Sequence, residues 1–405
     1  MKILVVDQQL NPGGGTRFLL NLLLNLRQLD RGNAITLYCN LQQAQKHGIV
    51  AKLAEQGIET KWLETIRSFT KPRTIGSRAW EYVMRRTGRG KDTQEAYQTA
   101  LQKEIGELSA GFDLAYFPWP FHLKCPETRC PKIGTFHDFN FKYFFGLPIF
   151  TDQQTAALDE SIGNWLSDST AVVSTHFMRD ELLKFYPARD PVRVVHIASL
   201  NVYDMQEIGQ QDLPVDFIRD GVPYFLLPAH LTVHKNLGNV VAALSLLNKN
   251  SVRARLVITG SGTDKIKGKS GYYGLERGSR PFDVTGLGYV TDEQMHFLIK
   301  HAFAVINPSL YEAGNGIGLD AWPMGTAVLQ SDIPAFNEHL TLQGFKAFTF
   351  DPRCAASVAA AMEECIGDPA KRQRHIQESL SAGNAPSWEK AARGYLDIFK
   401  SVTHP

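Results

Sequence analysis

Short runs of apolar residues alternate with amphipathic helical patterns along almost the whole chain. A first series begins with the run KILVVD and ends with VRVVHIA; a second begins with PYFLLPA and ends with the helical stretch PRCAASVAAAMEECIG. Buried strands separated by helices are typical of βαβ units, whose strands lie parallel in one sheet. The sequence therefore predicts an α/β protein with two Rossmann-like domains. We expect these domains to face a central cleft, at the carboxyl ends of their strands.

The polar stretch QEIGQQDLPVDFIRDGVP separates the two series. We take residues 206–222 as the linker between an N-terminal domain at 1–205 and a C-terminal domain at 223–385. A Gly/Pro break precedes a final helix at 386–405, for which a path back to the N-terminal domain is an open alternative. Residues 67–91 carry eight Lys or Arg against one Glu, and they fit a basic loop or lid inserted between elements.

Composition limits the class of protein. With 405 residues, 43% of them hydrophobic and 21% charged, the chain is an ordinary globular protein with room for two or three domains. A net charge of +2 argues against a bulk nucleic-acid binder. Five cysteines without a C-x-x-C motif favour a reducing compartment, and the close pair Cys125 and Cys130 does not favour a metal or redox site.

No apolar run approaches the roughly 18 residues that a membrane-spanning helix needs. The apolar run at the N-terminus is also too short for a secretory signal peptide. We therefore expect a cytoplasmic protein, or at most one that is peripheral on the inner face of the membrane.

Residues 304–338, AVINPSLYEAGNGIGLDAWPMGTAVLQSDIPAFNE, have the pattern of a ligand pocket. A β-rich run leads into a loop that opens into a helix, with Glu312 at the loop entrance and Asp320 at the helix start. The loop contains three glycines: Gly314, Gly316 and Gly318. Glycines let backbone N–H groups approach a ligand, and a helix N-terminus favours an anion. A carboxylate at each end suits sugar hydroxyls. The stretch predicts a pocket for a ligand that carries phosphate and sugar.

Lys235 follows a strand in PAHLTVHKNL, at the start of a helix. A cation there can neutralise a diphosphate, although a solvated lysine in the first turn is the alternative. His230 and His234 lie in the same turn, and without a third ligand they do not favour a zinc site. The chain has no D-x-D spacing for a divalent-metal clamp. We therefore expect no metal and no other cofactor, with phosphate neutralised by Lys235, helix N-termini and glycine amides.

His137 and Asp138 end the strand KIGTFHD, where chemistry usually lies in an α/β domain, although a structural histidine fits equally well. The aromatic loop behind them contains Phe139, Phe141, Tyr143, Phe144 and Phe145. It fits the core, an acceptor platform or a membrane-touching edge. Gly13 to Thr16 and Gly260 to Gly262 form glycine-rich turns after strands, but neither matches the dinucleotide or Walker motifs.

The second half resembles a known family, the retaining GT-B fold glycosyltransferases of family 4. The stretch YFLLPAHLTVHKNLGNVVAAL is similar to the family's strand, basic turn and helix. The stretch GLGYVTDEQMHFLIKHAFAVINPSLYEAGNGIGLDAWPMGTAVLQSDIPAFNE is similar to its nucleotide-sugar motif almost throughout. The first half resembles the family loosely, through the glycine-rich first loop, the His-Asp at 137–138 and VVSTHFMRDEL.

This resemblance implies roles for residues of both halves. Glu312 would bind hydroxyls of the donor sugar, Lys235 would pair with the diphosphate, and His137 would lie beside the reacting sugar; we predict these three as catalytic. The predicted donor-binding residues are Gly14, Gly15, His230, Lys235, Gly260, Gly288, Tyr289, Val290, Glu312, Ala313, Gly314, Asn315, Gly316 and Asp320. Within this set Asp320 would contact the ribose, the amides from Ala313 to Gly316 the sugar and diphosphate, and residues 288–290 the base.

Three departures from the family pattern concern the donor. The second acid is Asp320 where the family usually has Glu, so its reach is shorter. The loop reads Ala-Gly-Asn-Gly rather than Gly-Phe-Gly, and His230 or Thr232 stands where the family has an arginine. These differences bear on donor affinity and identity more than on the reaction class.

The resemblance implies a retaining transfer of a hexose or deoxyhexose from a nucleoside diphosphate sugar to a hydroxyl acceptor, in polysaccharide or glycolipid biosynthesis. The acceptor would be a saccharide or lipid-linked saccharide bound by the N-terminal domain. The basic residues at 67–91 fit an anionic acceptor or a membrane surface, and equally a solvated loop. The alternatives are a non-catalytic sugar-nucleotide-binding or scaffold protein of the same fold, and a GT-B epimerase or phosphorylase.

Overall fold

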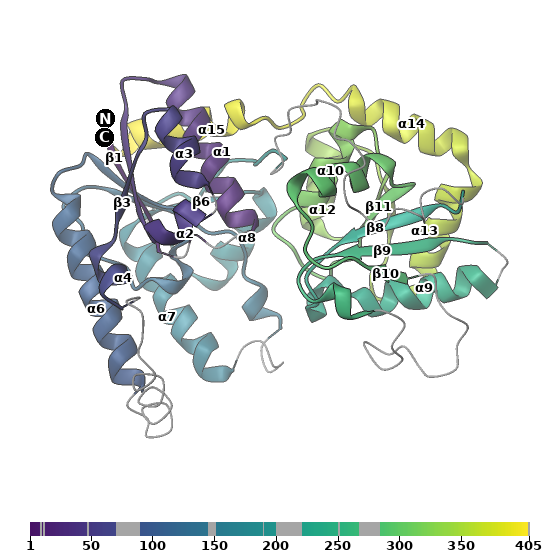
Figure 1. Ribbon diagram of the computed structural model, residues 1–405, viewed down its shortest axis with the longest axis horizontal. Helices are drawn as coiled ribbons and strands as arrows, with labels where there is room; N and C mark the ends of the chain where they lie inside the picture. The colour runs from purple at the N-terminus through teal and green to yellow at the C-terminus, as the bar shows by residue number, and fades with distance from the viewer. Residues whose placement is uncertain are drawn as a thin grey trace. The chain divides into compact units, whose positions relative to one another are not determined.

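The computed structural model describes residues 1–8, 10, 13–46, 48–69, 90–144, 151–188, 190–199, 221–249, 252–266 and 284–403. Most of the predicted basic insertion at 67–91 and of the predicted linker at 206–222 lies outside these residues, as does Phe145. The chain forms two compact units (Figure 1): unit 1 is Met1–Ile197 with Ser387–Pro405, and unit 2 is Ala198–Pro386. Each is built around a parallel sheet with helices, which confirms the predicted α/β class.

Seven parallel strands form the sheet of unit 1, in the order β3-β2-β1-β4-β5-β6-β7. The strands are β1 (Lys2–Asp7), β2 (Ala34–Cys39), β3 (Glu59–Trp62), β4 (Leu114–Phe117), β5 (Lys132–Thr135), β6 (Thr170–Val173) and β7 (Arg193–Val194). In the centre, Leu4 of β1 is paired with Thr36 on one side and with Ala115 on the other. The chain builds the sheet outward from β1 in one direction and then, from β4, in the other.

The helices of unit 1 are α1 (Gly14–Leu29), α2 (Leu41–Lys46), α3 (Ile49–Glu55), α4 (Glu64–Phe69), α6 (Gly90–Ser109), α7 (Asp152–Asp168), α8 (His176–Phe185) and α15 (Trp388–Thr403). Two short 3-10 helices, η1 (Pro120–His122) and η2 (Asn140–Lys142), follow β4 and β5. The C-terminal helix α15 packs against α1. Its Tyr395 hydroxyl lies 2.9 Å from Thr135 Oγ1, which in turn lies 2.8 Å from the Tyr116 hydroxyl. Since all three side chains are buried, α15 completes the core of unit 1.

Six parallel strands form the sheet of unit 2, in the order β10-β9-β8-β11-β12-β13. The strands are β8 (Tyr224–Pro228), β9 (Arg255–Thr259), β10 (Val284–Gly286), β11 (Ala304–Asn307), β12 (Val328–Ser331) and β13 (Phe348–Phe350). The helices are α9 (Leu237–Lys249), α10 (Asp292–His301), α11 (Gly316–Ala321), α12 (Pro334–Leu342), α13 (Ala355–Gly367) and α14 (Pro369–Leu380), with 3-10 turns η4 (Val233–Lys235), η5 (Thr263–Ile266) and η6 (Trp322–Met324). Here too the strand order reverses in the middle, between β8 and β11.

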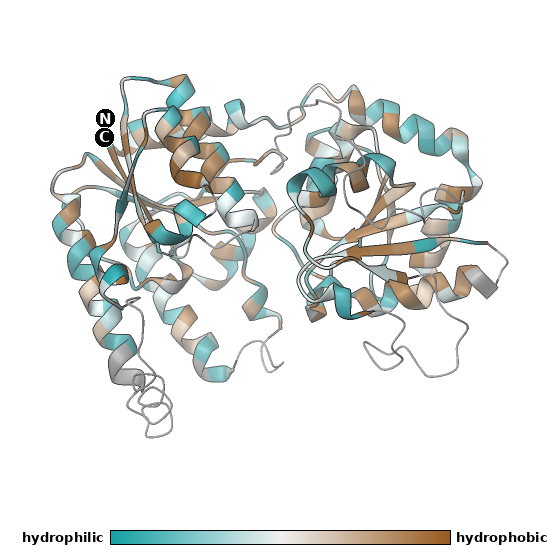
Figure 2. Ribbon diagram, viewed as in Figure 1, coloured by the Kyte–Doolittle hydropathy of each residue, from teal (hydrophilic) through white to brown (hydrophobic). Residues whose placement is uncertain are grey.

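Hydropathy follows this layering. Figure 2 shows the strands of both sheets largely in brown, whereas α14, most of whose residues are accessible to solvent, is mostly teal. The four residues of β4, β6, β11 and β12 are all buried, as expected for strands of parallel sheets covered on both faces. In the described part of the chain, no helix has the length and apolar character that crossing a membrane requires.

The buried hydroxyl group of Tyr395 provides a test of the packing of α15. Tyr395→Phe should destabilise unit 1 by about 1 kcal/mol, because Thr135 loses one of its two hydroxyl partners. Lys400→Ala on the exposed face of the same helix should change stability by less than about 0.5 kcal/mol. Calorimetry should show that Tyr395→Phe lowers the unfolding temperature of one unit, while the core variant Phe336→Leu identifies the transition of unit 2. A Tyr395→Phe effect on the unit 2 transition would contradict the placement of α15.

Candidate functional site

The loops after β8 and β11 leave the sheet of unit 2 at the point where the strand order reverses. The chain passes from β8 to β9 on one side and from β11 to β12 on the other. Connections that diverge in this way open a crevice beyond the carboxyl ends of the two strands, where α/β proteins bind ligands. Lys235 ends η4 after β8, and Glu312 lies in the loop after β11. The two residues that the sequence singled out for donor binding therefore share one end of the sheet.

Lys235 and Glu312 contact each other directly. The Nζ of Lys235 donates to Oε1 of Glu312 across 77 sequence positions, and the two side chains are 24% and 20% exposed. Two hydrogen bonds hold their loops together: Leu310 N–H donates to the His234 carbonyl at 2.8 Å, and the Asn236 side chain donates to the Pro308 carbonyl at 3.0 Å. The pair is therefore built into two joined loops rather than formed by two mobile side chains.

The carboxylate of Glu312 has a second internal partner. Ser309 Oγ lies 2.8 Å from the same oxygen, Oε1, that accepts from Lys235. Within the described ranges, the other oxygen, Oε2, accepts no hydrogen bond. One oxygen of Glu312 is thus fixed by the protein, and the other can accept from a ligand hydroxyl.

Two amides of the glycine-rich loop already have partners inside the protein. Asn315 is fully buried, and its side chain caps α11 by accepting from Gly318 N–H at 2.9 Å. Its backbone N–H donates to Nε2 of His339 at 3.1 Å, and Gly316 N–H faces the Gly314 carbonyl at 3.2 Å. The amides of Asn315 and Gly316 therefore face internal acceptors, and their predicted contacts with sugar and diphosphate stay a prediction. Ala313 and Gly314 directly follow Glu312 in the loop, and their contacts with a donor stay a prediction.

Asp320 lies on α11 and is only 6% exposed. Its Oδ1 accepts from Ser199 Oγ at 2.6 Å, across 121 positions. Sequence reasoning missed Ser199, because no local pattern connects it with α11. The predicted ribose contact of Asp320 stays a prediction; in the structure this carboxylate already binds one hydroxyl group.

The predicted base-binding segment lies beside tight turns at the ends of β9 and β10. Gly260 has φ +134°, and a Cβ on it would lie 2.3 Å from the Ala229 carbonyl oxygen. Its N–H donates to the Gly288 carbonyl at 2.7 Å, and Gly288 N–H donates to Thr263 Oγ1 at 2.9 Å. Both glycines thus hold the turns together. Tyr289 is 65% exposed and Val290 is buried, so of this segment the tyrosine ring is the part open to a ligand.

His230 and His234 surround Lys235 without adding charge. Burial, and then the nearby Lys235, lower the pKa of His230. Burial is also the main cause of a lowered pKa for His234, which Glu312 partly offsets. Both shifts favour the neutral ring, so His230 is a poor substitute for the positive charge of the arginine that the family pattern has in this region.

In unit 1, His137 follows β5 and is held by three contacts. Its Nε2 faces the Pro118 carbonyl at 2.9 Å, so this nitrogen carries the proton and donates. The ring stacks on Trp119 at 4.8 Å and meets the edge of Phe18 at 4.8 Å. Burial lowers the pKa of His137 to about 4. The ring is therefore neutral at physiological pH, with a fixed tautomer and orientation.

Gly14 and Gly15 form the first turn of α1, directly after the loop that leaves β1. A Cβ on Gly15 would lie 3.9 Å from Trp119, which follows β4. Since β1 and β4 are the strands between which the order of this sheet reverses, the glycine turn, Trp119 and His137 lie at the corresponding end of unit 1. Sequence reasoning missed Trp119, whose WPF context has no motif.

The aromatic loop after β5 serves mainly as core. Phe139 and Phe141 are 0% and 2% exposed, which favours the first of the three readings for these rings. Tyr143 is 41% exposed, and its hydroxyl donates to Glu181 on α8. The loop is therefore fastened to α8 rather than presented as a continuous aromatic surface.

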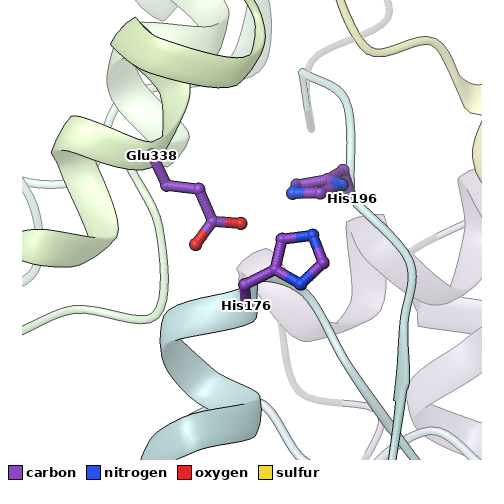
Figure 3. Close-up of side chains that lie close together, drawn as sticks. All are labelled: His176, His196 and Glu338. Atoms are coloured by element: carbon purple, nitrogen blue, oxygen red, sulfur yellow. The ribbon is translucent and has the colours of Figure 1, made fainter.

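Two further histidines of unit 1 lie close together, as Figure 3 shows. His176 begins α8 and His196 follows β7, and their ring centroids are 5.5 Å apart. The guanidinium of Arg179 reaches Nδ1 of His176 at 3.3 Å. The sequence contained no signal for this pair, because the two rings meet only when β7 joins the sheet.

Known proteins resemble this chain both in its second half and over most of its length. Residues 210–381, which make up most of unit 2, match the family model described as glycosyl transferases group 1. The O-antigen chain mannosyltransferase B of Escherichia coli is 24% identical over 294 residues, which are 71% of this chain and 74% of the relative.

Solved structures match over nearly the full length. HepE of Anabaena in complex with UDP-glucose aligns with a TM-score of 0.65 and 14% identity, covering 99% of this chain and 100% of that chain. Sucrose-phosphate synthase of Thermosynechococcus elongatus aligns with a TM-score of 0.68 and 14% identity, covering 99% and 98%. These likenesses establish the GT-B fold with its two Rossmann-like domains.

The neutral state of His137 can be measured directly. Its imidazole should titrate with a midpoint near 4, well below the ordinary 6.5, because protonation would place a charge among Trp119 and Phe18. Since the unfolded chain then binds the proton more readily than the folded one, stability should fall as the pH drops from 6.5 towards 4, by up to on the order of 3 kcal/mol. Histidine NMR titration, assigned with His137→Gln, checks the midpoint. A His137 midpoint near 6.5 would refute this account.

Proposed function

We propose that this chain, whose residues 210–381 carry the group 1 glycosyltransferase domain, transfers a hexose or deoxyhexose from a nucleoside diphosphate sugar to a hydroxyl acceptor. We further propose that the anomeric configuration is retained, and that the acceptor is a saccharide or lipid-linked saccharide of polysaccharide or glycolipid biosynthesis. The E. coli relative named as an O-antigen mannosyltransferase and the HepE complex with UDP-glucose support this choice of substrates.

The contact between Lys235 and Glu312 carries the proposal. A nucleoside diphosphate sugar presents negative charge on the diphosphate and hydroxyl donors on the sugar, a few bonds apart. A lysine and a carboxylate that touch each other at the end of two adjacent strands offer one complementary group to each part. Oε2 of Glu312, which accepts nothing within the described part of the chain, suits a sugar hydroxyl.

In the proposed reaction, the bond between the anomeric carbon and the leaving diphosphate oxygen breaks. The acceptor oxygen bonds to the anomeric carbon on the same face, and its proton passes to the leaving phosphate oxygen. Lys235 stabilises the negative charge that grows on the diphosphate, while Glu312 holds the sugar in position. No protein nucleophile is needed in this scheme.

His137 suits a place beside the reacting sugar, as the family resemblance implies. The sugar develops positive charge as the leaving group departs, and a cationic imidazole nearby would oppose that charge. Burial among aromatic rings keeps His137 neutral. We therefore assign it a role in shaping the reacting centre rather than in moving a proton at neutral pH.

The ion pair must open when the donor binds, which makes two variants informative. Glu312→Gln should reduce transfer by about 100-fold or more, because the sugar loses a charged acceptor. The same variant should bind the free nucleoside diphosphate at least as tightly as the wild type, since Lys235 is released from its partner. Lys235→Ala should weaken nucleoside diphosphate binding. Calorimetric titration and a transfer assay measure both effects. Full transfer by Glu312→Gln would remove the central claim.

A non-catalytic binding protein of the same fold is the rival function, because the neutral His230 leaves the site without a second charge at that position. A thermal-shift panel of UDP, GDP, ADP and TDP, followed by hydrolysis of the matching donor sugars, separates the two. We expect stabilisation by one nucleotide and slow hydrolysis of its sugar, both unchanged by EDTA, since Lys235 replaces a metal in neutralising phosphate. Stabilisation without hydrolysis or transfer would favour the binding protein, and loss in EDTA would contradict metal independence.

A further inference from the structure

A series of close polar contacts leads from Glu312 into the interior of unit 2. Ser309 Oγ lies 2.8 Å from Glu312 Oε1 and 2.9 Å from Asn307 Oδ1. Asn307 Nδ2 donates to Asn315 Oδ1 at 2.9 Å, and Asn315 N–H donates to His339 Nε2 at 3.1 Å. We refer to this series, from Glu312 to His339, as the amide relay.

The orientations of Asn315 and His339 in the relay follow from two backbone donors. Gly318 N–H can only donate, so the Asn315 atom that it meets at 2.9 Å must be the acceptor Oδ1. Nδ2 of Asn315 therefore donates to Gln330 Oε1, at 2.7 Å. Because Asn315 N–H also donates, His339 Nε2 must carry a lone pair, and the ring proton lies on Nδ1. That nitrogen faces Gln343 Oε1 at 2.8 Å and donates to it.

Burial makes these orientations costly to change. The polar side chains of the network are 0–8% exposed: Asn307, Ser309, Asn315, Gln330, His339 and Gln343. Water cannot replace a partner at such positions, so a group that turned away would be left without a hydrogen bond. The network ties together the end of β11, the start of α11, β12 and α12. Glu312, at its end, is the member that a ligand can reach.

We propose that His339 is a positioning residue for Glu312, an inference that rests on the proposed transferase function. Without Nε2 as acceptor, the buried N–H of Asn315 would have no partner, and the turn that caps α11 would shift. Asn307 and Ser309 would then lose their fixed arrangement. The Glu312 carboxylate would in turn lose its orientation. The loop of Lys235 is anchored separately, through Asn236.

Because the two residues are held separately, a variant of His339 should impair sugar binding and transfer but not nucleotide binding. The relay serves the residue that binds the sugar, whereas Lys235 serves the diphosphate. His339→Leu should therefore keep the affinity for the free nucleoside diphosphate within about twofold, while the extra affinity given by the attached sugar disappears. Transfer should slow on the order of 10- to 100-fold, as expected for a misplaced reacting group.

Two companion variants separate positioning from mere stability. His339→Gln places an amide oxygen near the position of Nε2 and should restore most of the transfer rate. Phe336→Leu, at a fully buried position on the same helix and outside the relay, should lower the melting temperature and leave sugar discrimination unchanged. The probes are the nucleotide of the thermal-shift panel that binds best and its sugar derivative. Amide hydrogen exchange at Asn315 and Gly318 reports the relay independently of activity.

The proposal is supported if His339→Leu, but not Phe336→Leu, loses sugar discrimination together with amide protection at Asn315 and Gly318. It is overturned if His339→Leu transfers as fast as the wild type, if His339→Gln is as impaired as His339→Leu, or if Phe336→Leu shows the same loss. A wild-type protein that binds no nucleoside diphosphate sugar would contradict the proposed function itself. Normal transfer by the wild type together with normal transfer by His339→Leu would contradict only the relay.

Discussion

The reversal of strand order between β8 and β11 is the constraint on which the candidate site depends. Two adjacent parallel strands that send their connections to opposite sides leave the space beyond their carboxyl ends unfilled. This geometry brings Lys235 and Glu312 together, although 77 positions separate them in the chain. Unit 1 repeats the arrangement at β1 and β4, where the turn at Gly15 lies beside Trp119. Both sets of candidate residues thus follow from one topological rule.

If the proposed function holds, the ion pair itself would discriminate between ligands. While Lys235 and Glu312 contact each other, neither charge is left unpaired at a largely buried position, which would be costly. A simple phosphate that drew Lys235 away would leave Glu312 without its cation. A ligand with a phosphate and hydroxyl groups in one molecule satisfies both residues when the pair opens. On this proposal, the pair would favour sugar phosphates over inorganic phosphate without any group that repels the latter.

The sequence predicted those features of the fold and the site that depend on residues close together in the chain. The strands, the two glycine turns and the positions of Lys235 and Glu312 at strand ends follow from periodicity and from the rule for parallel sheets. The internal hydrogen bond of the Asn315 amide was not predicted, because its partner is His339, 24 positions later on another helix. Ser199 and Trp119 carry no local signal, since their partners come from distant segments. The neutral state of His137 also depends on three separate elements.

The single proton of Ser309 explains how Glu312 stays in place during the proposed exchange of partners. Its hydroxyl lies within hydrogen-bonding distance of Glu312 Oε1 and of Asn307 Oδ1, and it can donate to only one of them at a time. Once a diphosphate draws Lys235 away, the unpaired carboxylate becomes the stronger acceptor. Asn307 keeps its orientation, because its Nδ2 remains bound to Asn315. Only the Ser309 hydroxyl has to rotate, so Glu312 remains hydrogen-bonded to the protein while Lys235 binds the diphosphate.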